Sequence, residues 1–165
     1  SLAIDSLVVR LIELIDSIPV LFLLIALSAI LNSSAANLIL IIASVAWTGM
    51  AKHIRAQVLR IKQRPYIESG RSMGFGSFRL LYKHIFPNAM APVFISLSFG
   101  IASAILFEST LSFLGLGLGA DQVSWGSLLA EARSDYQSWW LALFPGLILF
   151  LSLMSLNRLG DALSK

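Results

Sequence analysis

The sequence predicts an all-α protein that crosses a membrane several times. Hydrophobic residues make up 57% of the 165 positions and charged residues only 13%, with a mean hydropathy of +0.82. A soluble domain usually carries about a quarter charged residues. Three long runs, residues 17–51, 84–107 and 136–157, contain no Asp, Glu, Lys or Arg. A spanning helix needs roughly 20 apolar residues. Most classes of soluble enzyme are therefore excluded.

The uncharged runs divide into four expected spans. The first run is long enough for two crossings, and the polar stretch from Asn32 to Asn37 within it suits a turn between antiparallel helices. The first span must include Glu13 and Asp16 to reach full length. Pro19 in the first span and Pro145-Gly146 in the fourth are each expected to interrupt a helix. The spans are expected at about residues 11–31, 36–53, 88–110 and 138–157.

The basic residues predict the orientation of these spans. Eleven of the twelve Lys and Arg residues fall on one side, and only Arg133 falls on the other. The positive-inside rule then places both ends of this chain and residues 54–87 in the cytoplasm, with the hairpin 111–137 outside. Because topology accounts for the basic charge, we expect no nucleic-acid partner. The chain has no Cys, and His53 and His84 are far apart, so we expect no metal site.

The segment 54–87 is polar but has the pattern of a helix-turn-helix elbow. Pro65 fits the first position of a short helix ending near Met73. Gly74-Phe75-Gly76 breaks it, and Ser77 is the expected N-cap of a second segment. Helices this short are marginal in water, so the elbow must pack against its own bundle or a cytoplasmic partner. The expected apolar face of the second segment is Phe78, Leu81, Tyr82 and Ile85.

The elbow resembles the EAA loop of bacterial ABC importer permeases. That motif reads E-A-A, three residues, Gly, nine residues, I-x-L-P, and Glu68, Gly74 and Pro87 match it in register. Ser69 and Gly70 replace the two alanines. His84 and Phe86 replace the isoleucine and leucine of the motif.

A second set of motifs is similar to the dipeptide, oligopeptide and nickel branch of these permeases. It consists of Glu108–Gly117 (ESTLSFLGLG), Ser124-Trp125-Gly126, Trp140–Gly146 (WLALFPG) and Asn157–Asp161 (NRLGD). The resemblance covers essentially all 165 residues and implies the helical bundle of a type I ABC importer permease. Members of this branch commonly have six spans, so about two N-terminal spans are expected to be missing from this chain.

The resemblance implies how the subunit would work. In such importers the elbow rests on a cytoplasmic ABC ATPase, whose closure switches the permease between inward-facing and outward-facing states. Further implied partners are a second homologous permease, a periplasmic or lipid-anchored substrate-binding protein and the lipid of a bacterial inner membrane. This chain has no phosphate-binding G-x-x-x-x-G-K motif, so it is expected to be a transport subunit without cofactors rather than an enzyme. The implied coupling residues are Glu68, Ser69, Gly70, Ser72, Gly74, Phe78 and Pro87.

Several of these residues also have ordinary structural interpretations. Glu68 either pairs with a basic group of the ATPase or caps its own helix, and Gly74 is either a coupling residue or a plain loop glycine. In the third span Ser96, Gly100, Ala104 and Glu108 form a stripe of small and polar residues. Such a stripe serves close helix contact or lines a wet path. We favour the interpretation that Glu108 anchors the glycine-rich turn that follows the span. The alternative interpretation is that Glu108 contacts the substrate.

Two kinds of function remain open at this point. Peptides are the expected cargo and nickel is the nearest alternative. A secondary transporter or a structural membrane subunit is the alternative class, but it should show an inverted repeat, and no repeat is visible. Outside the membrane, residues 125–136 are expected to form an interfacial helix, and Trp139 and Trp140 an aromatic belt.

Overall fold

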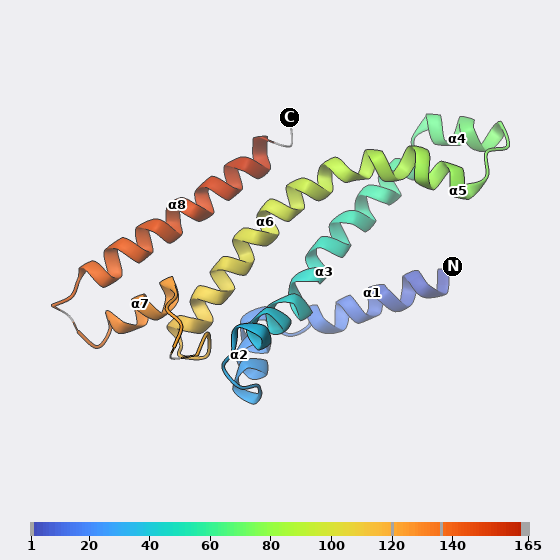
Figure 1. Ribbon diagram of the computed structural model, residues 1–165. Coiled ribbons are helices and arrows are strands. Elements are labelled where there is room, and N and C mark those ends of the chain that lie inside the picture. Colours follow the sequence, from blue (N-terminus) through green and yellow to red (C-terminus); the bar gives the residue numbers. More distant parts are fainter. Residues whose placement is uncertain (1, 120, 136, 163–165) are drawn as a thin grey trace. The chain divides into compact units, whose positions relative to one another are not determined.

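The computed structural model describes residues 2–119, 121–135 and 137–162, and these residues form helices and loops without any β-strand. The chain divides into two compact units, which we call the bundle unit (Ser1–Thr48 with Ala102–Ser155) and the elbow unit (Gly49–Ile101 with Leu156–Lys165). The helices are α1 (Leu2–Asp16), α2 (Val20–Ile30), α3 (Ala35–Lys62), α4 (Pro65–Ser72), α5 (Ser77–Leu80), η1 (Leu81–Ile85), α6 (Phe86–Phe113), α7 (Trp125–Glu131) and α8 (Trp140–Ala162) (Figure 1).

Among the residues that the structure describes, three helices are long and apolar enough to cross a membrane. They are α3, the part of α6 from Pro92 to Phe113, and α8. A fourth crossing is possible if α1 and α2 together count as one broken span. The all-α membrane class predicted from composition is therefore confirmed.

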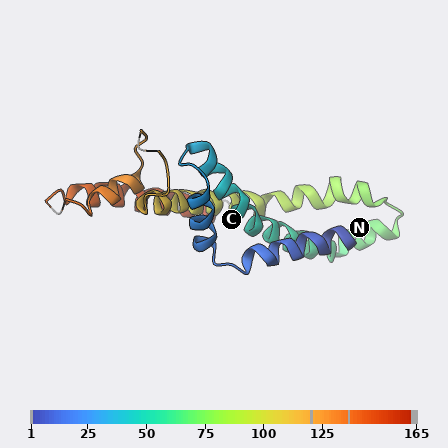
Figure 2. The same ribbon diagram turned by 90° about the horizontal axis from the view of Figure 1, so that it is seen from below.

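The interruption expected at Pro19 in the span 11–31 is confirmed. The chain forms α1 and α2 there, bent by 83° at Ser17–Pro19 (Figure 2). Proline has no N–H and disfavours helical geometry at the residue before it. Pro19 accordingly stands as the N-cap residue of α2, and its carbonyl accepts a hydrogen bond from the Phe22 N–H. Pro145, in contrast, lies inside α8 without ending it.

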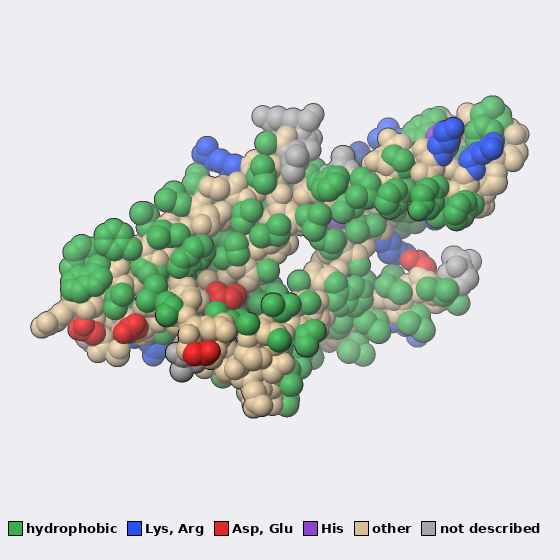
Figure 3. All heavy atoms as spheres, viewed as in Figure 1, with side chains coloured by type: hydrophobic (Ala, Val, Ile, Leu, Met, Phe, Trp, Pro, Cys, Tyr) green, Lys and Arg blue, Asp and Glu red, His purple; other side chains and the backbone are tan. Residues whose placement is uncertain are grey.

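The core of the bundle unit joins α2, α3 and the end of α6. Its buried residues are Leu24, Leu38, Ile41, Val45 and Leu111. The Thr48 hydroxyl donates to Asp16 Oδ1 at 3.2 Å, which ties the end of α1 to α3. Many other large apolar side chains stay exposed, for example Phe22 at 69% and Phe150 at 59%, and hydrophobic side chains dominate the visible surface (Figure 3). Such surfaces suit lipid or neighbouring helices rather than water.

The elbow unit is a hairpin in which α4 and α5 lie side by side (Figures 1 and 2). Its core consists of Ile61 from α3, Ile67 from α4, Ile85 from η1 and Ala89 from α6, with Val58 packed against them. The segment η1 is one π-helical turn, in which the Phe86 N–H donates to the Leu81 carbonyl. It joins α5 to α6, so helical structure continues from Ser77 to Phe113.

One expectation for the second elbow segment is wrong, and another holds only in part, because Phe78 and Tyr82 share a face but Ile85 is buried. Gly76, not Ser77, occupies the N-cap position of α5, and no side chain caps that helix. The buried residues are Leu80 and Ile85, whereas Phe78, Leu81 and Tyr82 are exposed. The π turn carries an additional residue compared with an α-helical turn. It therefore shifts the face that a regular 3.6-residue period predicts.

The helix expected at residues 125–136 is shorter in the structure. Helix α7 ends at Glu131, and residue 136 lies outside the described residues. Its start is well defined by a capping box, in which the Ser127 N–H donates to Ser124 Oγ at 3.2 Å and the Ser124 N–H donates to Ser127 Oγ at 2.9 Å. These two bonds satisfy N–H groups that a helix start leaves unpaired.

Candidate functional site

The turn of the elbow is a glycine-terminated helix end. Gly74 has φ of +80°, in the left-handed region where residues other than glycine are strained. Its N–H donates to the Arg71 carbonyl at 2.9 Å, and the Phe75 N–H donates to the Gly70 carbonyl at 3.0 Å. These two bonds form a Schellman motif, which ends α4 and reverses the chain towards α5. Gly74 therefore has a specific conformational role beyond that of a plain loop glycine.

Gly70 lets the two short helices approach each other. It is buried, and a Cβ at this position would lie 2.8 Å from Leu80 Cδ2 and 3.3 Å from Phe75 Cδ2. The neighbours are the ends of side chains, so a larger residue requires them to move rather than the backbone. Gly70 stands where the motif has an alanine, and the missing Cβ leaves room for Leu80 to pack closely.

The remaining predicted coupling residues of the elbow hairpin lie on its exposed surface. Glu68 is exposed in the first turn of α4, where the helix dipole stabilises a carboxylate. Arg64 is the N-cap residue, and its side chain makes no capping bond. The Ser72 hydroxyl donates to the Glu68 carbonyl at 3.1 Å. Ser69 and Pro87 are likewise exposed.

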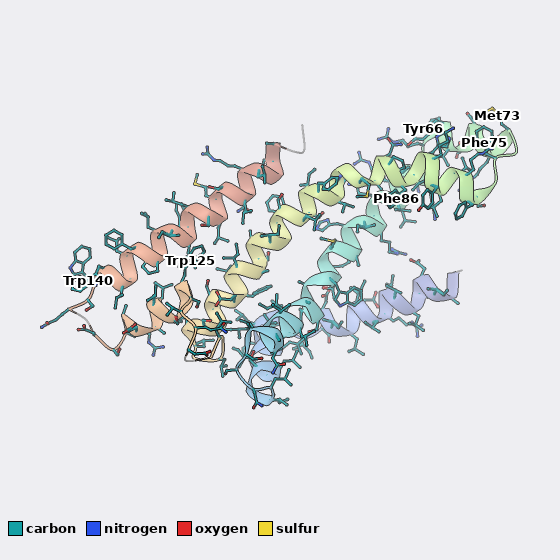
Figure 4. All side chains as sticks on the ribbon, viewed as in Figure 1. Tyr66, Met73, Phe75, Phe86, Trp125 and Trp140 are labelled. Atoms are coloured by element: carbon teal, nitrogen blue, oxygen red, sulfur yellow. The ribbon has the colours of Figure 1, made fainter. Side chains whose placement is uncertain are left out.

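An exposed row of aromatic rings runs along the second arm of the elbow. The Phe78 and Tyr82 rings stack with centroids 5.5 Å apart, and the Tyr82 and Phe86 rings with centroids 5.9 Å apart. We call these three residues the aromatic ladder; their side chains are 75%, 66% and 53% exposed. Figure 4 shows Phe86, Tyr66, Met73 and Phe75 on the same hairpin. The sequence placed Phe78 and Tyr82 on one expected face but did not add Phe86 to it, although the four-residue spacing from Tyr82 to Phe86 was a usable signal.

The predicted stripe of the third span is divided between the two units. In the elbow unit, Ser96 Oγ donates to the Pro92 carbonyl of its own helix at 3.0 Å. A Cβ at Gly100 would meet no atom within 4 Å, so no described part of the chain approaches closely there. In the bundle unit, Ala104 and Glu108 line a cavity.

Glu108 is held by serines of its own helix. Ser112 Oγ donates to Glu108 Oε1 at 2.7 Å and Ser109 Oγ donates to Oε2 at 3.3 Å. Helix α6 then ends in a second Schellman motif, in which the Gly115 N–H donates to the Ser112 carbonyl at 3.0 Å and the Leu116 N–H to the Leu111 carbonyl at 2.8 Å. Ser112 thus links the carboxylate to the turn, and the chain returns so closely that a Cβ at Gly117 would overlap Ser112.

The cavity of the bundle unit has a volume of about 630 Å³ and mainly apolar walls. Its lining includes Leu38 and Ile39 of α3, Ile105 of α6 and Leu128 of α7. Glu108 is the charged residue of this lining. No group of three or more His, Cys, Asp or Glu side chains suited to a metal ion occurs within residues 2–119, 121–135 and 137–162.

A family model matches residues 2–165, which is almost the entire chain. Its description is "binding-protein-dependent transport system inner membrane component". This description and the apolar helices agree on a multi-pass protein of the inner membrane.

Curated relatives support the same family. The chain is 36% identical to a putative peptide transport system permease protein of Brucella suis over 161 residues, 96% of this chain and 54% of the relative. It is 34% identical to the dipeptide transport system permease protein of Bacillus subtilis, over 97% of this chain and 51% of the relative. It is 37% identical to the oligopeptide transport system permease protein of Salmonella typhimurium, over 97% of this chain and 53% of the relative. The chain spans about half the length of these relatives, and it belongs to the family of binding-protein-dependent transport system inner membrane components.

Proposed function

We propose that this chain forms part of the permease subunit of an ATP-driven ABC importer for di- or oligopeptides. The match to the family over residues 2–165 carries this proposal. The relatives described above carry peptide, dipeptide and oligopeptide transport in their names. Nickel is the alternative cargo, and none of the three relatives described above is named for it.

The elbow is the proposed contact with the ATPase. The buried core described above holds the hairpin together from one side. The outer side of the hairpin is therefore free to meet another protein. The outer side offers Glu68, Ser69 and Ser72 on α4 and the aromatic ladder on α5, η1 and α6. Exposed aromatic side chains are typical anchors of protein interfaces. Gly70 lies inside the hairpin and Gly74 forms its exposed turn. Pro87 is the second residue of α6, the helix that leads into the membrane.

The other partners follow from this assignment. A second permease subunit would complete the pathway, and a substrate-binding protein would deliver cargo at the opposite side of the membrane from the elbow. The elbow and both ends of this chain are then cytoplasmic, in keeping with eleven of the twelve basic residues on that side. ATP hydrolysis belongs to the ATPase subunits, and this chain transmits its effect.

The test uses the complete importer in proteoliposomes. We expect a thiol introduced by Ser72→Cys to crosslink to the cognate ATPase, since Ser72 is exposed beside the proposed contact. We expect Gly74→Asp to abolish peptide-stimulated ATP hydrolysis, because a side chain at φ of +80° disturbs the turn.

Gly76 provides a matched control for this experiment. It lies two residues further along, has φ of −61° and leaves open space for a Cβ. Gly76→Asp should therefore insert and couple far better than Gly74→Asp. Equal coupling in both variants, together with no crosslink from residue 72, contradicts the proposed role of the elbow.

A further inference from the structure

The cavity of the bundle unit combines a carboxylate and an indole ring in apolar surroundings. Glu108 and Trp125 both line it, and its volume of about 630 Å³ lies in the usual range of small-molecule sites, about 300–1,000 Å³. We propose that this cavity binds the N-terminal ammonium group of a peptide cargo, with Glu108 and Trp125 as its ligands. The proposal rests on the proposed function, since it requires that peptides pass through this subunit.

The Glu108 carboxylate has acceptor positions left for a further hydrogen-bond donor. Ser112 and Ser109 each donate to one of its oxygens, at 2.7 and 3.3 Å. A carboxylate offers about four acceptor positions, so about two remain for a ligand. Glu108 is half-buried, and a carboxylate beside apolar walls attracts a positive charge more strongly than one in water does. A primary ammonium group supplies that charge and up to three N–H donors.

Trp125 supplies the second contact. An aromatic face attracts a cation lying within about 6 Å of its centre, and tryptophan does so most strongly. Trp125 is the first residue of α7, whose start is held by the Ser124 and Ser127 capping box. Figure 4 shows it at this position, at the beginning of α7.

The backbone holds these two ligands in a set relation. Gly126 is buried, and a Cβ there would overlap the carbonyl group of Ser109. Gly126 follows Trp125 and Ser109 follows Glu108 in the sequence. The contact between the two backbones therefore places the indole and the carboxylate on adjoining walls of the same cavity. A preorganised pair of this kind loses little entropy when a ligand binds.

The chemistry of the lining favours an organic ammonium ion over a metal ion. One carboxylate and one serine hydroxyl, that of Ser124, are the polar side chains of the lining. Divalent metal ions require several oxygen or nitrogen ligands. The apolar walls formed by Leu38, Ile39 and Leu128 instead suit the side chains of a short peptide.

Occupancy of the cavity is measured by protection of a thiol. These 165 residues contain no Cys, so Leu128→Cys introduces the one thiol of this chain at the cavity wall, and any Cys elsewhere in the full-length subunit is replaced. The full-length subunit is assembled with cysteine-free partners in nanodiscs of phosphatidylglycerol and phosphatidylcholine and labelled with a maleimide. Dileucine and N-acetyl-dileucine are compared as protecting ligands. The substrate-binding protein is left out, so that its own preference between the two peptides does not affect the result.

We expect dileucine to protect the thiol at a concentration roughly tenfold lower than N-acetyl-dileucine, since acetylation removes the charge and the donors of the ammonium group. Glu108→Gln should abolish the difference between the two peptides. Glu131→Gln is the matched control, because Glu131 is exposed at the end of α7 and away from the lining, and it should preserve the difference.

Several results would overturn the proposal. They are equal protection by both peptides in the Leu128→Cys subunit, a difference that survives Glu108→Gln, and protection without any peptide, which would indicate a neighbouring subunit as the occupant. Protection that appears only when phosphatidylethanolamine is added would assign the ammonium group to a lipid. If the importer accumulates peptide while any of these holds, only the cavity proposal fails. If no peptide is accumulated or stimulates ATP hydrolysis, the proposed function itself fails.

Discussion

The two Schellman turns of this chain have the same backbone but different surroundings. Gly74 ends α4 and Gly115 ends α6, with φ values of +80° and +78°. A Cβ added at either glycine would meet no atom within 4 Å. Beside Gly74, a Cβ added at Gly70 would meet only side-chain atoms, those of Leu80 and Phe75. The chain after Gly115 packs backbone against backbone, at Gly117 and Gly126.

This difference separates a deformable hairpin from a rigid turn. Side-chain ends move by rotation about their own bonds, but a backbone carbonyl moves only with its helix. The elbow is therefore able to adjust to a partner while keeping its turn. The region from Glu108 to Gly126 is instead suited to holding a cavity wall in position.

The largest expected effect is at Gly126. Gly126→Ala introduces a Cβ that overlaps the Ser109 carbonyl, and relief requires α7 to move away from α6. We expect a loss of about 3 kcal/mol of stability, at the upper end for overpacked cores. Thermal unfolding of the importer carrying this substitution measures the loss.

Gly146→Ala is the control for this prediction. Gly146 also lies within a helix, but its Cβ would be 3.9 Å from Leu129 Cδ2, an ordinary contact. Alanine there should be neutral or stabilising by up to about 1 kcal/mol, from its higher helix propensity. Similar melting temperatures for the two variants would show that α7 does not pack on α6 as the structure has it.

The next effect compares the two turns directly. Gly74→Ala and Gly115→Ala both place a Cβ in the left-handed region, at a cost of about 1–2 kcal/mol each. We expect similar losses of thermal stability from the two substitutions. Coupling should differ, because only Gly74 lies in the proposed contact with the ATPase. The measurement is the ratio of peptide-stimulated to basal ATP hydrolysis, and an equal fall in both variants would contradict the division between the two regions.

Much of the fold was predictable because it depends on local sequence. Long uncharged runs predicted the membrane helices, and Pro65 and Gly74 predicted the limits of α4. What was missed depends on contacts between segments. The bend at Pro19 was expected only as an interruption, and its 83° angle required the structure. The close packing of Leu80 depends on Gly70, and the face of the residues after Leu80 depends on the π turn. A regular helical period represents neither.

The candidate site was predictable to a smaller extent. Spacing identified Gly74, and the third-span stripe included Glu108. No local pattern, however, brings Trp125 to the same cavity as Glu108, because that juxtaposition depends on the contact of Gly126 with Ser109. Motif resemblance named the Ser124-Trp125-Gly126 stretch without a physical reason. The structure supplies that reason in the close approach of the two backbones.

The smallest expected effect tests the segment between α7 and α8, where Asp135 forms a local turn. Ser138 Oγ donates to Asp135 Oδ2, and the Gln137 N–H donates to Oδ1 at 3.1 Å. These bonds, with the Ser138 hydroxyl first, lower the pKa of Asp135 from its ordinary value of 3.8. A carboxyl whose pKa is lowered by folding stabilises the folded state above that ordinary value, and the contribution disappears as the pH falls through the lowered pKa.

Ser138→Ala should therefore reduce thermal stability slightly at pH 7 and lose this effect at a pH below the lowered pKa of Asp135. The matched variant is Ser134→Ala, since the Ser134 hydroxyl donates to the Glu131 carbonyl rather than to a carboxylate. Its effect on the melting temperature should not depend on pH in the same range. Because Asp135 is fully exposed, the change at Ser138 should be far smaller than that at Gly126. A large effect would mean that this segment, like the turn after Gly115, supports the packing of the bundle unit.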